Sequence, residues 1–180
     1  MHRTLPYIVL FVLLCLVQIF LLNHLVAWSV FSPLLYVAFI ILLPLDTKPI
    51  VLLLTALLTG VVMDYTMGIA GLNTVATLPI AFFRPHIIRL LSSREDSRDE
   101  GVPSPERMGK NLYWSYVSAM VILHHTLFFL LEALTWGHLV ELVLRLVLSS
   151  AATIILVRLV GKLFTAKYTT RNNDKPLGRL

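Results

Sequence analysis

The stretch TLPYIVLFVLLCLVQIFLLNHLVAWSVFSPLLYVAFIILLPL, residues 4–45, contains no Lys, Arg, Asp or Glu. One α-helix needs about 20 mainly apolar residues to cross a bilayer, so this stretch is long enough for two crossings. Polar residues around Asn23 and Pro33 interrupt it and predict helices at about 5–24 and 31–45. Pro33 suits the first turn of the second helix, where its missing N–H has no helical partner.

The composition of the whole chain agrees with membrane insertion. Of its 180 residues, 57% are hydrophobic and 14% are charged, and the mean hydropathy is +0.81. A soluble domain carries about 25% charged residues, so this chain has too little polar surface to face water all round. We therefore expect a single-domain, all-α, polytopic integral membrane protein. The first apolar run is long for a signal peptide, and we expect it to be retained as a span.

Further apolar runs complete the predicted helices. The run from Ile50 to Phe83 is too long for one crossing, and Gly68 and Gly71 mark a tight turn inside it. Residues 92–111 are polar and rich in mixed charges, which predicts a flexible cytoplasmic loop. The remaining helices are predicted at 49–67, 71–91, 112–133 and 139–164, which gives a six-helix domain over 1–165 and a basic, disordered cytoplasmic tail over 166–180.

The basic residues predict the orientation. Every Lys and Arg except Arg145 can be placed on, or reaching toward, one side of a six-span model, and cytoplasmic loops carry the excess of these residues. Both termini are therefore expected in the cytoplasm of a multi-pass protein. Arg84 and Arg89 lie near the inner end of their predicted helix and are expected to reach the headgroups. The net charge of +5 is explained by this topology, so nucleic acid is not an expected partner.

Asp64 is the first candidate functional residue, because an acidic group within a span usually faces a bundle interior or a cavity. It stands four residues after Gly60 and four before Gly68, and Ala56 continues the same helix face. Small residues on one face allow another helix to approach closely. This pattern predicts a packing or partner-binding face built around one carboxylate. The alternative is an interfacial Asp that reaches water and ends the helix.

Arg145 is the second candidate, because it lies inside a predicted span. Glu141 precedes it by four residues, the favourable order for an ion pair on a helix, so an intramembrane Glu141–Arg145 pair is predicted. Glu132, at the end of the preceding helix, could also approach Arg145. A sharper alternative is that Arg145 meets Asp64 or a carboxylate of a partner helix.

Other chemistry has little support in the sequence. His124 and His125 are adjacent on a predicted helix and do not share a face, so buried hydrogen-bonding histidines are expected rather than metal ligands. The single cysteine, Cys15, cannot form an intramolecular disulfide. The chain contains no phosphate-binding loop, dinucleotide fingerprint or hydrolase motif. We expect no enzymatic activity, no cofactor and no metal.

The stretch LLTGVVMDYTMGIAGLN, residues 57–73, resembles the signature region of the MreD family of bacterial rod-shape-determining membrane proteins. That family shows a Gly, then an Asp a few residues later, then glycines and a small or polar residue that opens the next span. Here these positions are held by Gly60, Asp64, Gly68, Gly71 and Asn73. The chain length, the order of spans and the short outer turns are also similar.

The resemblance implies a non-enzymatic scaffold subunit of the machinery for cell shape and lateral peptidoglycan synthesis. Relatives bind MreC, a single-span protein with a large periplasmic domain. Through it they join the MreB filament, the RodA glycosyltransferase and its partner transpeptidase. The face formed by Ala56, Gly60, Asp64 and Gly68, with Gly71 and Asn73 beyond the turn, would then meet the partner. The family is also similar in fold to the substrate-binding S-components of energy-coupling-factor vitamin transporters, which supplies an alternative function.

Overall fold

The computed structural model of the chain describes residues 4–25, 31–69, 71–92, 101–133 and 139–173. These residues are helical or irregular and include no strand, which confirms the all-α prediction. The elements are α1 (Leu5–Val17), η1 (Gln18–Leu22), α2 (Asn23–Leu25), α3 (Val37–Leu42), α4 (Pro49–Met67), α5 (Leu72–Leu91), α6 (Pro105–Met108), α7 (Lys110–Glu132) and α8 (Leu139–Asn173).

Four helices are long and apolar enough to cross a membrane, as a multi-pass protein requires. They comprise the residues Leu5–Leu22, Pro49–Met67, Lys110–Glu132 and Val140–Thr165. Each of them exposes large apolar side chains along part of its surface, where lipid can replace the protein core as apolar surroundings. These four spans are the part of the six-span prediction that hydropathy and helix length support directly.

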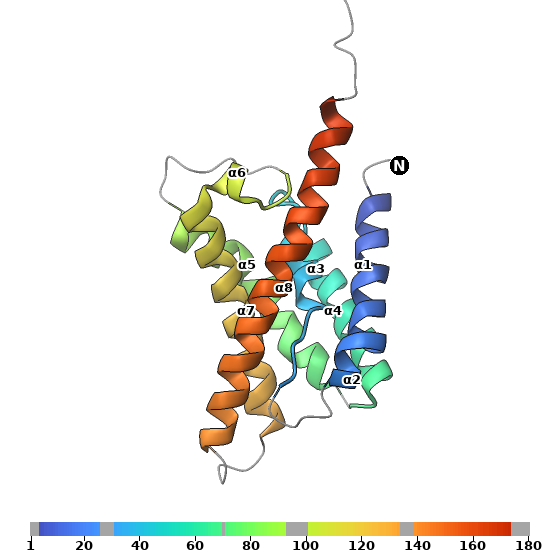
Figure 1. Cartoon of the computed structure of the whole chain (residues 1–180), viewed down its shortest axis with the longest axis vertical. Helices are drawn as coiled ribbons and strands as arrows, with labels where there is room; N and C mark the ends of the chain where they lie inside the picture. The colour runs from blue at the N-terminus through green and yellow to red at the C-terminus, as the bar shows by residue number, and fades with distance from the viewer. Residues whose placement is uncertain (1–3, 26–30, 70, 93–100, 134–138, 174–180) are drawn as a thin grey trace, which may run out of the picture.

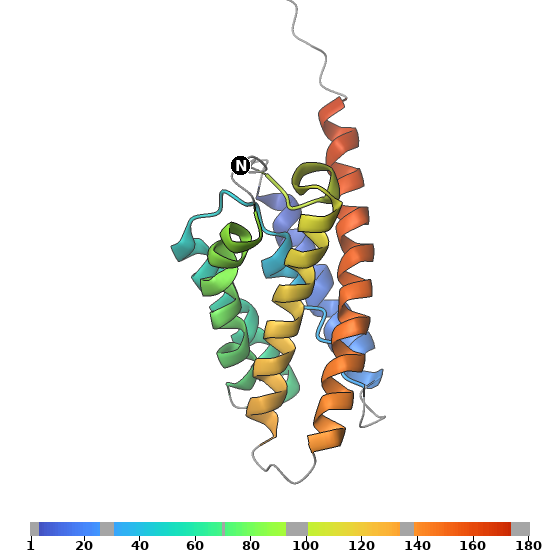
Figure 2. The ribbon, with the colours of Figure 1, turned by 90° about the vertical axis from the view of Figure 1, so that its left-hand side faces the viewer.

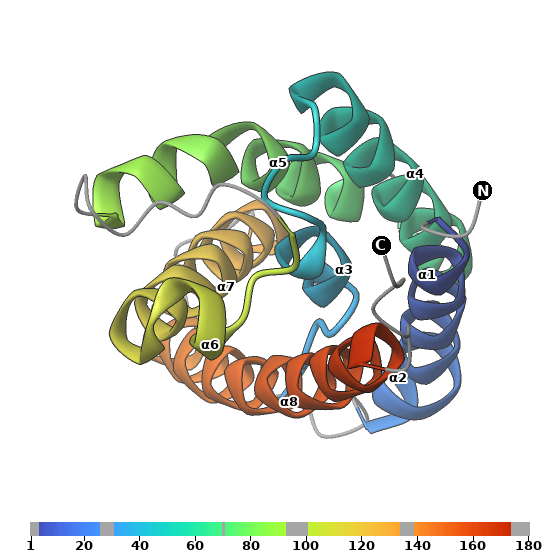
Figure 3. The same ribbon diagram turned by 90° about the horizontal axis from the view of Figure 1, so that it is seen from above.

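The short helix α3 lies at the centre of the bundle, inside a ring of α1, α4, α5, α7 and α8 (Figure 3). Every residue from Ser32 to Leu43 is buried. Seen from the side, the chain rises from the lower end of the bundle into α3, between the longer helices (Figure 1). A segment that is apolar on all sides belongs in such a core, because it has no polar face to present to water.

The prediction of a helix at 31–45 is wrong for more than half of these residues. Residues 31–34 are irregular, 35–36 form a turn, and only Val37–Leu42 are α-helical. Pro33 restricts Ser32 to an extended conformation, so the helix cannot begin there. At the other end Leu43 is extended (φ −58°, ψ 150°), as expected for a residue that precedes a proline.

The other predicted boundaries agree more closely. The first span is continuously helical from Leu5 to Leu25, but its middle, Gln18–Leu22, is wound as a π-helix. Helix α4 matches its predicted range, and α5 begins one residue after the predicted start. The turn between them contains Gly68 (φ 67°) and Gly71 (φ 81°), both in the left-handed region that favours glycine.

Two predictions at the polar end of the bundle need correction. The predicted flexible loop 92–111 is ordered from Gly101 onward. The Gly101 carbonyl accepts a hydrogen bond from Leu45 N (2.8 Å), and the chain then enters α6, where Met108 is buried. Residues 93–100 of that loop lie outside the described part of the chain. The tail predicted to be disordered from 166 is instead helical to Asn173, because α8 continues past its predicted end at 164.

Helices α4 and α5 approach each other most closely at Gly60. An ideal Cβ atom on Gly60 would lie 2.4 Å from Thr74 Cα, a backbone atom that cannot move aside alone. Gly161 of α8 is the other helical glycine with a close neighbour, where the Cβ atom would lie 2.7 Å from the Tyr113 hydroxyl. A phenol can shift at lower cost than a helix backbone.

We therefore expect Gly60→Ala to destabilise the protein by about 1–3 kcal/mol, the usual cost of overpacking, and Gly161→Ala to cost clearly less. Both substitutions carry the same gain in helix propensity, so the difference isolates the contact. Thermal unfolding in a mild detergent, followed by tryptophan fluorescence, measures it. Equal melting temperatures for the two variants would contradict the close α4–α5 approach.

Candidate functional site

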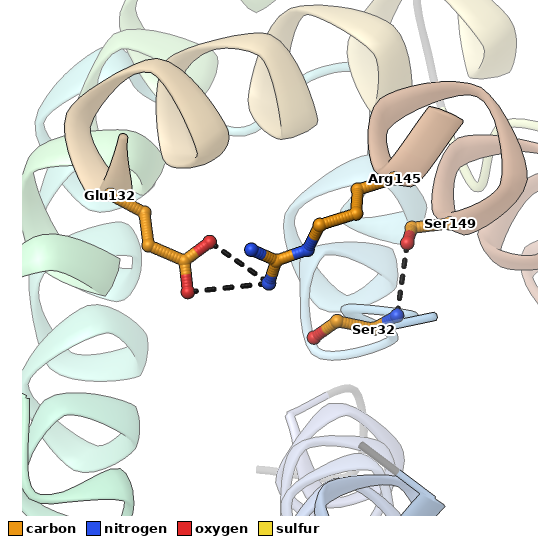
Figure 4. A network of polar contacts seen from close by, with 4 residues as sticks. All are labelled: Ser32, Glu132, Arg145 and Ser149. Atoms are coloured by element: carbon orange, nitrogen blue, oxygen red, sulfur yellow. Dashed lines mark hydrogen bonds and ion pairs between the residues drawn. The ribbon is translucent and has the colours of Figure 1, made fainter. Parts of the chain in front are cut away.

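The irregular segment 31–36 needs external hydrogen-bond partners, because its peptide groups are buried in the bundle and lack the bonds of a helix. Two of its N–H groups are satisfied by hydroxyls of α8. Ser32 N donates to Ser149 Oγ (2.9 Å; Figure 4), and Leu34 N donates to Thr153 Oγ1 (3.2 Å). The two acceptors stand four residues apart, so one face of α8 serves the segment.

Gln18 serves the same segment from the first span. Its Oε1 accepts from Leu35 N (2.7 Å), and its Nε2 donates to Pro33 O (3.2 Å) and to Asn23 Oδ1 (2.9 Å). The side-chain amide thus replaces one backbone donor and one backbone acceptor that a helix would have supplied. Gln18 is fully buried and opens the π-helical segment, an irregularity that is common at functional sites.

A directed chain of hydrogen bonds links the segment to α4, α5 and α7. Asn73 donates through Nδ2 to Asp64 Oδ1 (3.0 Å), so its Oδ1 is the acceptor for the Tyr36 hydroxyl (2.8 Å). That bond uses the single proton of the Tyr36 hydroxyl. His124 Nε2, 3.1 Å from the same hydroxyl oxygen, must therefore donate to it. Thr77 Oγ1 donates to Asn73 O (2.6 Å), so it too can only accept from His124.

This directionality assigns opposite tautomers to the two histidines. His124 carries its proton on Nε2 when neutral, which leaves its buried Nδ1 as an acceptor with no donor among the described residues. His125 Nδ1 lies 3.0 Å from Val121 O and must donate to that carbonyl, so its Nε2 accepts from Thr153 Oγ1 (3.1 Å). The prediction of buried, hydrogen-bonded histidines is confirmed, with one acceptor atom of His124 left over.

Asp64 caps the N-terminus of α5. Its Oδ1 accepts from Asn73 N (2.8 Å), and its Oδ2 accepts from Thr74 N (3.0 Å) and Thr74 Oγ1 (2.5 Å). The first N–H groups of a helix lack intrahelical partners and attract negative charge. The carboxylate supplied by α4 meets both needs, while Gly71 at the N-cap position has no side chain to do so.

The predicted small-residue face therefore packs within the chain. Ala56 and Gly60 are buried, and Gly60 touches Thr74 of α5. Gly68 is exposed and ends α4 in a left-handed conformation. The structure brings Asp64 together with Asn73, and on the face predicted to serve packing or a partner it places α5 of the same chain.

Arg145 forms its ion pair with Glu132 rather than with the predicted Glu141. Its Nη2 lies 3.0 Å from Glu132 Oε2 and 3.3 Å from Oε1 (Figure 4). The guanidinium carbon also stands 5.0 Å from the centre of the Phe129 ring. Both contacts reach across to α7, where the ring adds a cation–π attraction. Glu141 is exposed on α8. The pair is 21% and 36% exposed, so it contributes little to stability.

Arg84 is the main residue that sequence reasoning placed wrongly. It was predicted to reach the headgroups, but it is 1% exposed. Its Nη2 donates to Leu43 O, its Nη1 to Pro44 O (3.1 Å) and its Nε to the Tyr116 hydroxyl (2.8 Å). These carbonyls lie at the C-terminal end of α3, where free C=O groups favour a cation. Nothing local in the sequence marks Arg84 as different from Arg89, which is exposed.

No protein-family model matches this chain, and no curated protein and no solved structure shows significant similarity to it. Function must therefore be argued from the two features above. One is the hairpin of α4 and α5 closed by Asp64. The other is the polar network around the irregular segment.

The first prediction from this site is that Asp64→Asn destabilises the protein by about 1–3 kcal/mol. An amide nitrogen in place of Oδ2 would face the Thr74 N–H, which leaves donors without acceptors. Asp46→Asn is the control, because Asp46 is exposed and accepts only one long bond, from Gly101 N (3.3 Å). Thermal unfolding in detergent measures both. If the control variant were as unstable as Asp64→Asn, the capping role of Asp64 would be contradicted.

The second prediction compares two arginines of α5. Arg84→Lys keeps the charge but cannot supply three donors in a fixed planar geometry, so we expect a loss of about 2–4 kcal/mol. Arg89→Lys, at an exposed position of the same helix, is expected to change the unfolding free energy by less than about 0.5 kcal/mol. Unfolding with a denaturing detergent measures both. Similar stabilities for the two variants would show that Arg84 does not stabilise the C-terminal end of α3.

Proposed function

We propose that this protein is a non-enzymatic membrane scaffold subunit of the bacterial complex for cell shape and lateral peptidoglycan elongation, with a bitopic, MreC-like protein as its direct partner. The observation that carries the proposal is the α4–α5 hairpin. The residues behind the resemblance to the MreD family lie together there: Asp64 accepts hydrogen bonds from Asn73, Gly60 packs against Thr74, and Gly68 and Gly71 form the turn. Its polar groups hold backbone in place, which suits a structural role.

In this proposal the chain crosses the inner membrane six times. Helix α5 and the segment 31–43 make the two crossings beyond the four long apolar helices. The start of α1 and the end of α8 lie at the same end of the bundle (Figure 1), which supports a common side for both termini. Lys48 precedes α4, Arg89 lies in the last turn of α5 and Lys110 opens α7, and these helix ends lie toward that same end of the bundle (Figure 2). The positive-inside rule assigns such an end to the cytoplasm.

The partner helix is proposed to pack on the outward face of α4, because α5 covers the face of Ala56 and Gly60. The outward face carries Leu54, Leu58, Val61 and Tyr65 at helical spacing, and Tyr65 is 89% exposed. A single-span helix can bury such a stripe without displacing any element of this chain. The MreB filament, a RodA-type glycosyltransferase and its transpeptidase would join through the partner.

A second candidate function is substrate binding, as in an S-component-like subunit of a vitamin transporter. The observation that favours it is the buried Nδ1 of His124, an acceptor without a donor among the described residues, close to an irregular segment in the bundle core. Transporters place substrate sites at such broken helices. This reading predicts saturable binding of a small molecule that donates a hydrogen bond.

Affinity purification of the tagged protein from mild detergent, with mass spectrometry of co-purifying proteins, separates the two functions. We expect an MreC-like protein and elongation enzymes, and we expect Val61→Trp to reduce their recovery to background by blocking the α4 face. Val147→Trp, at an exposed valine of α8, is the matched control. Recovery of paired ATPases with a coupling membrane protein would instead establish the transporter function. Equal recovery with both variants would exclude the α4 face.

A further inference from the structure

A second charged cluster lies away from the polar network, where α7 begins beside α8. The Arg158 guanidinium carbon stands 4.8 Å from the centre of the Trp114 ring. Lys110 lies four residues before Trp114, and Lys162 lies four residues after Arg158, so each lysine shares a helix face with its neighbour. We call these four residues the α7–α8 basic face.

The antiparallel packing of the helices puts both lysines on the same side of the stacked pair. Helices α7 and α8 run side by side along the bundle (Figure 2), and α7 starts at the end toward which α8 runs. One turn back along α7 and one turn forward along α8 therefore lead in the same direction. The helices are close at this level, because a Cβ atom on Gly161 would lie 2.7 Å from the Tyr113 hydroxyl.

The three cations of this face are exposed and lack anionic partners within the described residues. Among the described residues, the ion pair is Arg145 with Glu132, and it lies at the opposite end of α7 from this face. Glu106 of α6, exposed and four residues before Lys110 in the chain, is a nearby acid. Even with Glu106 counted, the three cations of the face outnumber this acid among the described residues, so the face attracts anions.

The surroundings of the face match a lipid better than a soluble anion. On α8, the exposed apolar side chain of Ile155 (67%) lies one turn before Arg158, toward the middle of the bundle, and the exposed Leu159 follows Arg158 directly. A Trp–Arg stack of this kind is typical of the interfacial zone, where aromatic rings sit at headgroup depth. Cations above an apolar surface offer the two contacts that a phospholipid makes, one for its phosphate and one for its acyl chain.

We propose that the α7–α8 basic face is a binding site for an anionic phospholipid. Arg158, held in place by Trp114, donates hydrogen bonds to the headgroup phosphate, and Lys110 and Lys162 add charge from either side. The acyl chains lie along the apolar surface of α8. The site is separate from the polar network and from the outward face of α4, so it stands whether or not the proposed function holds.

The test uses the full-length protein in mild detergent, titrated with phosphatidylglycerol or phosphatidylcholine, with bound lipid counted by native mass spectrometry. We expect preference for phosphatidylglycerol, and roughly a 30-fold loss of that affinity in Arg158→Gln/Lys162→Gln, since each basic residue near an anionic surface contributes several-fold. Lys48→Gln/Arg89→Gln removes the same charge from exposed positions outside the face. It is expected to lose less than about threefold.

Four outcomes would overturn the proposal. Equal losses in the two double variants would mean general attraction rather than a site. Equal affinity for both lipids would show that the charge of the headgroup does not determine binding. Displacement of the lipid by millimolar inorganic phosphate would assign the site to a free anion. Because Arg158 packs on Trp114, Lys162→Glu serves as a second variant that leaves this contact intact. It should also weaken binding at least tenfold, and unchanged binding would contradict the site.

Discussion

The structure depends on satisfying the peptide groups of residues 31–36. In a bundle surrounded by hydrocarbon, an unpaired N–H or C=O costs several kcal/mol, because no water can replace the lost partner. The chain leaves these residues out of a helix and brings side chains to them from distant segments. Gln18 comes from the first span, and Ser149 and Thr153 come from α8. The first span, the irregular segment and α8 are thereby fixed to one another by polar contacts.

Two charged side chains extend the same principle to helix ends. Asp64 places its negative charge at the N-terminus of α5, and Arg84 places its positive charge at the C-terminus of α3. Each sign is the one that the helix dipole favours at that end. Both side chains also supply the hydrogen bonds that the terminal peptide groups lack. Asp64 and Arg84 therefore support the backbone of this chain, and the position of each follows from a helix end.

The elements that the sequence predicted well are those whose limits are local. Pro49 starts α4, and Gly68 ends it in a left-handed conformation that few other residues adopt. The predicted ranges of α4 and α5 agree with the structure for this reason. The spacing of Gly60 and Asp64 also predicted a tightly packed face, although α5 rather than a partner occupies it.

The errors share a different cause, which is contact over long sequence distances. Apolar residues at 31–45 have the composition of a helix, and the irregular backbone is stable because side chains from other elements bind it, two of them hydroxyls more than 100 residues away. Arg84 is buried because Leu43 and Pro44 present carbonyls to it, and Arg145 turns from Glu141 to Glu132 because α7 passes beside it. No pattern within one helix contains that information.

Helix α8 has a mechanical consequence. Its 35 residues make a rod of about 52 Å, whereas the hydrocarbon core of a bilayer is about 30 Å thick. The rod rises beyond the other helices at the end where α7 begins (Figure 1). Its base is anchored to the irregular segment through Ser149 and Thr153. A tilt of the core would thus displace the C-terminal end of α8 by several ångströms, together with any group bound to that end.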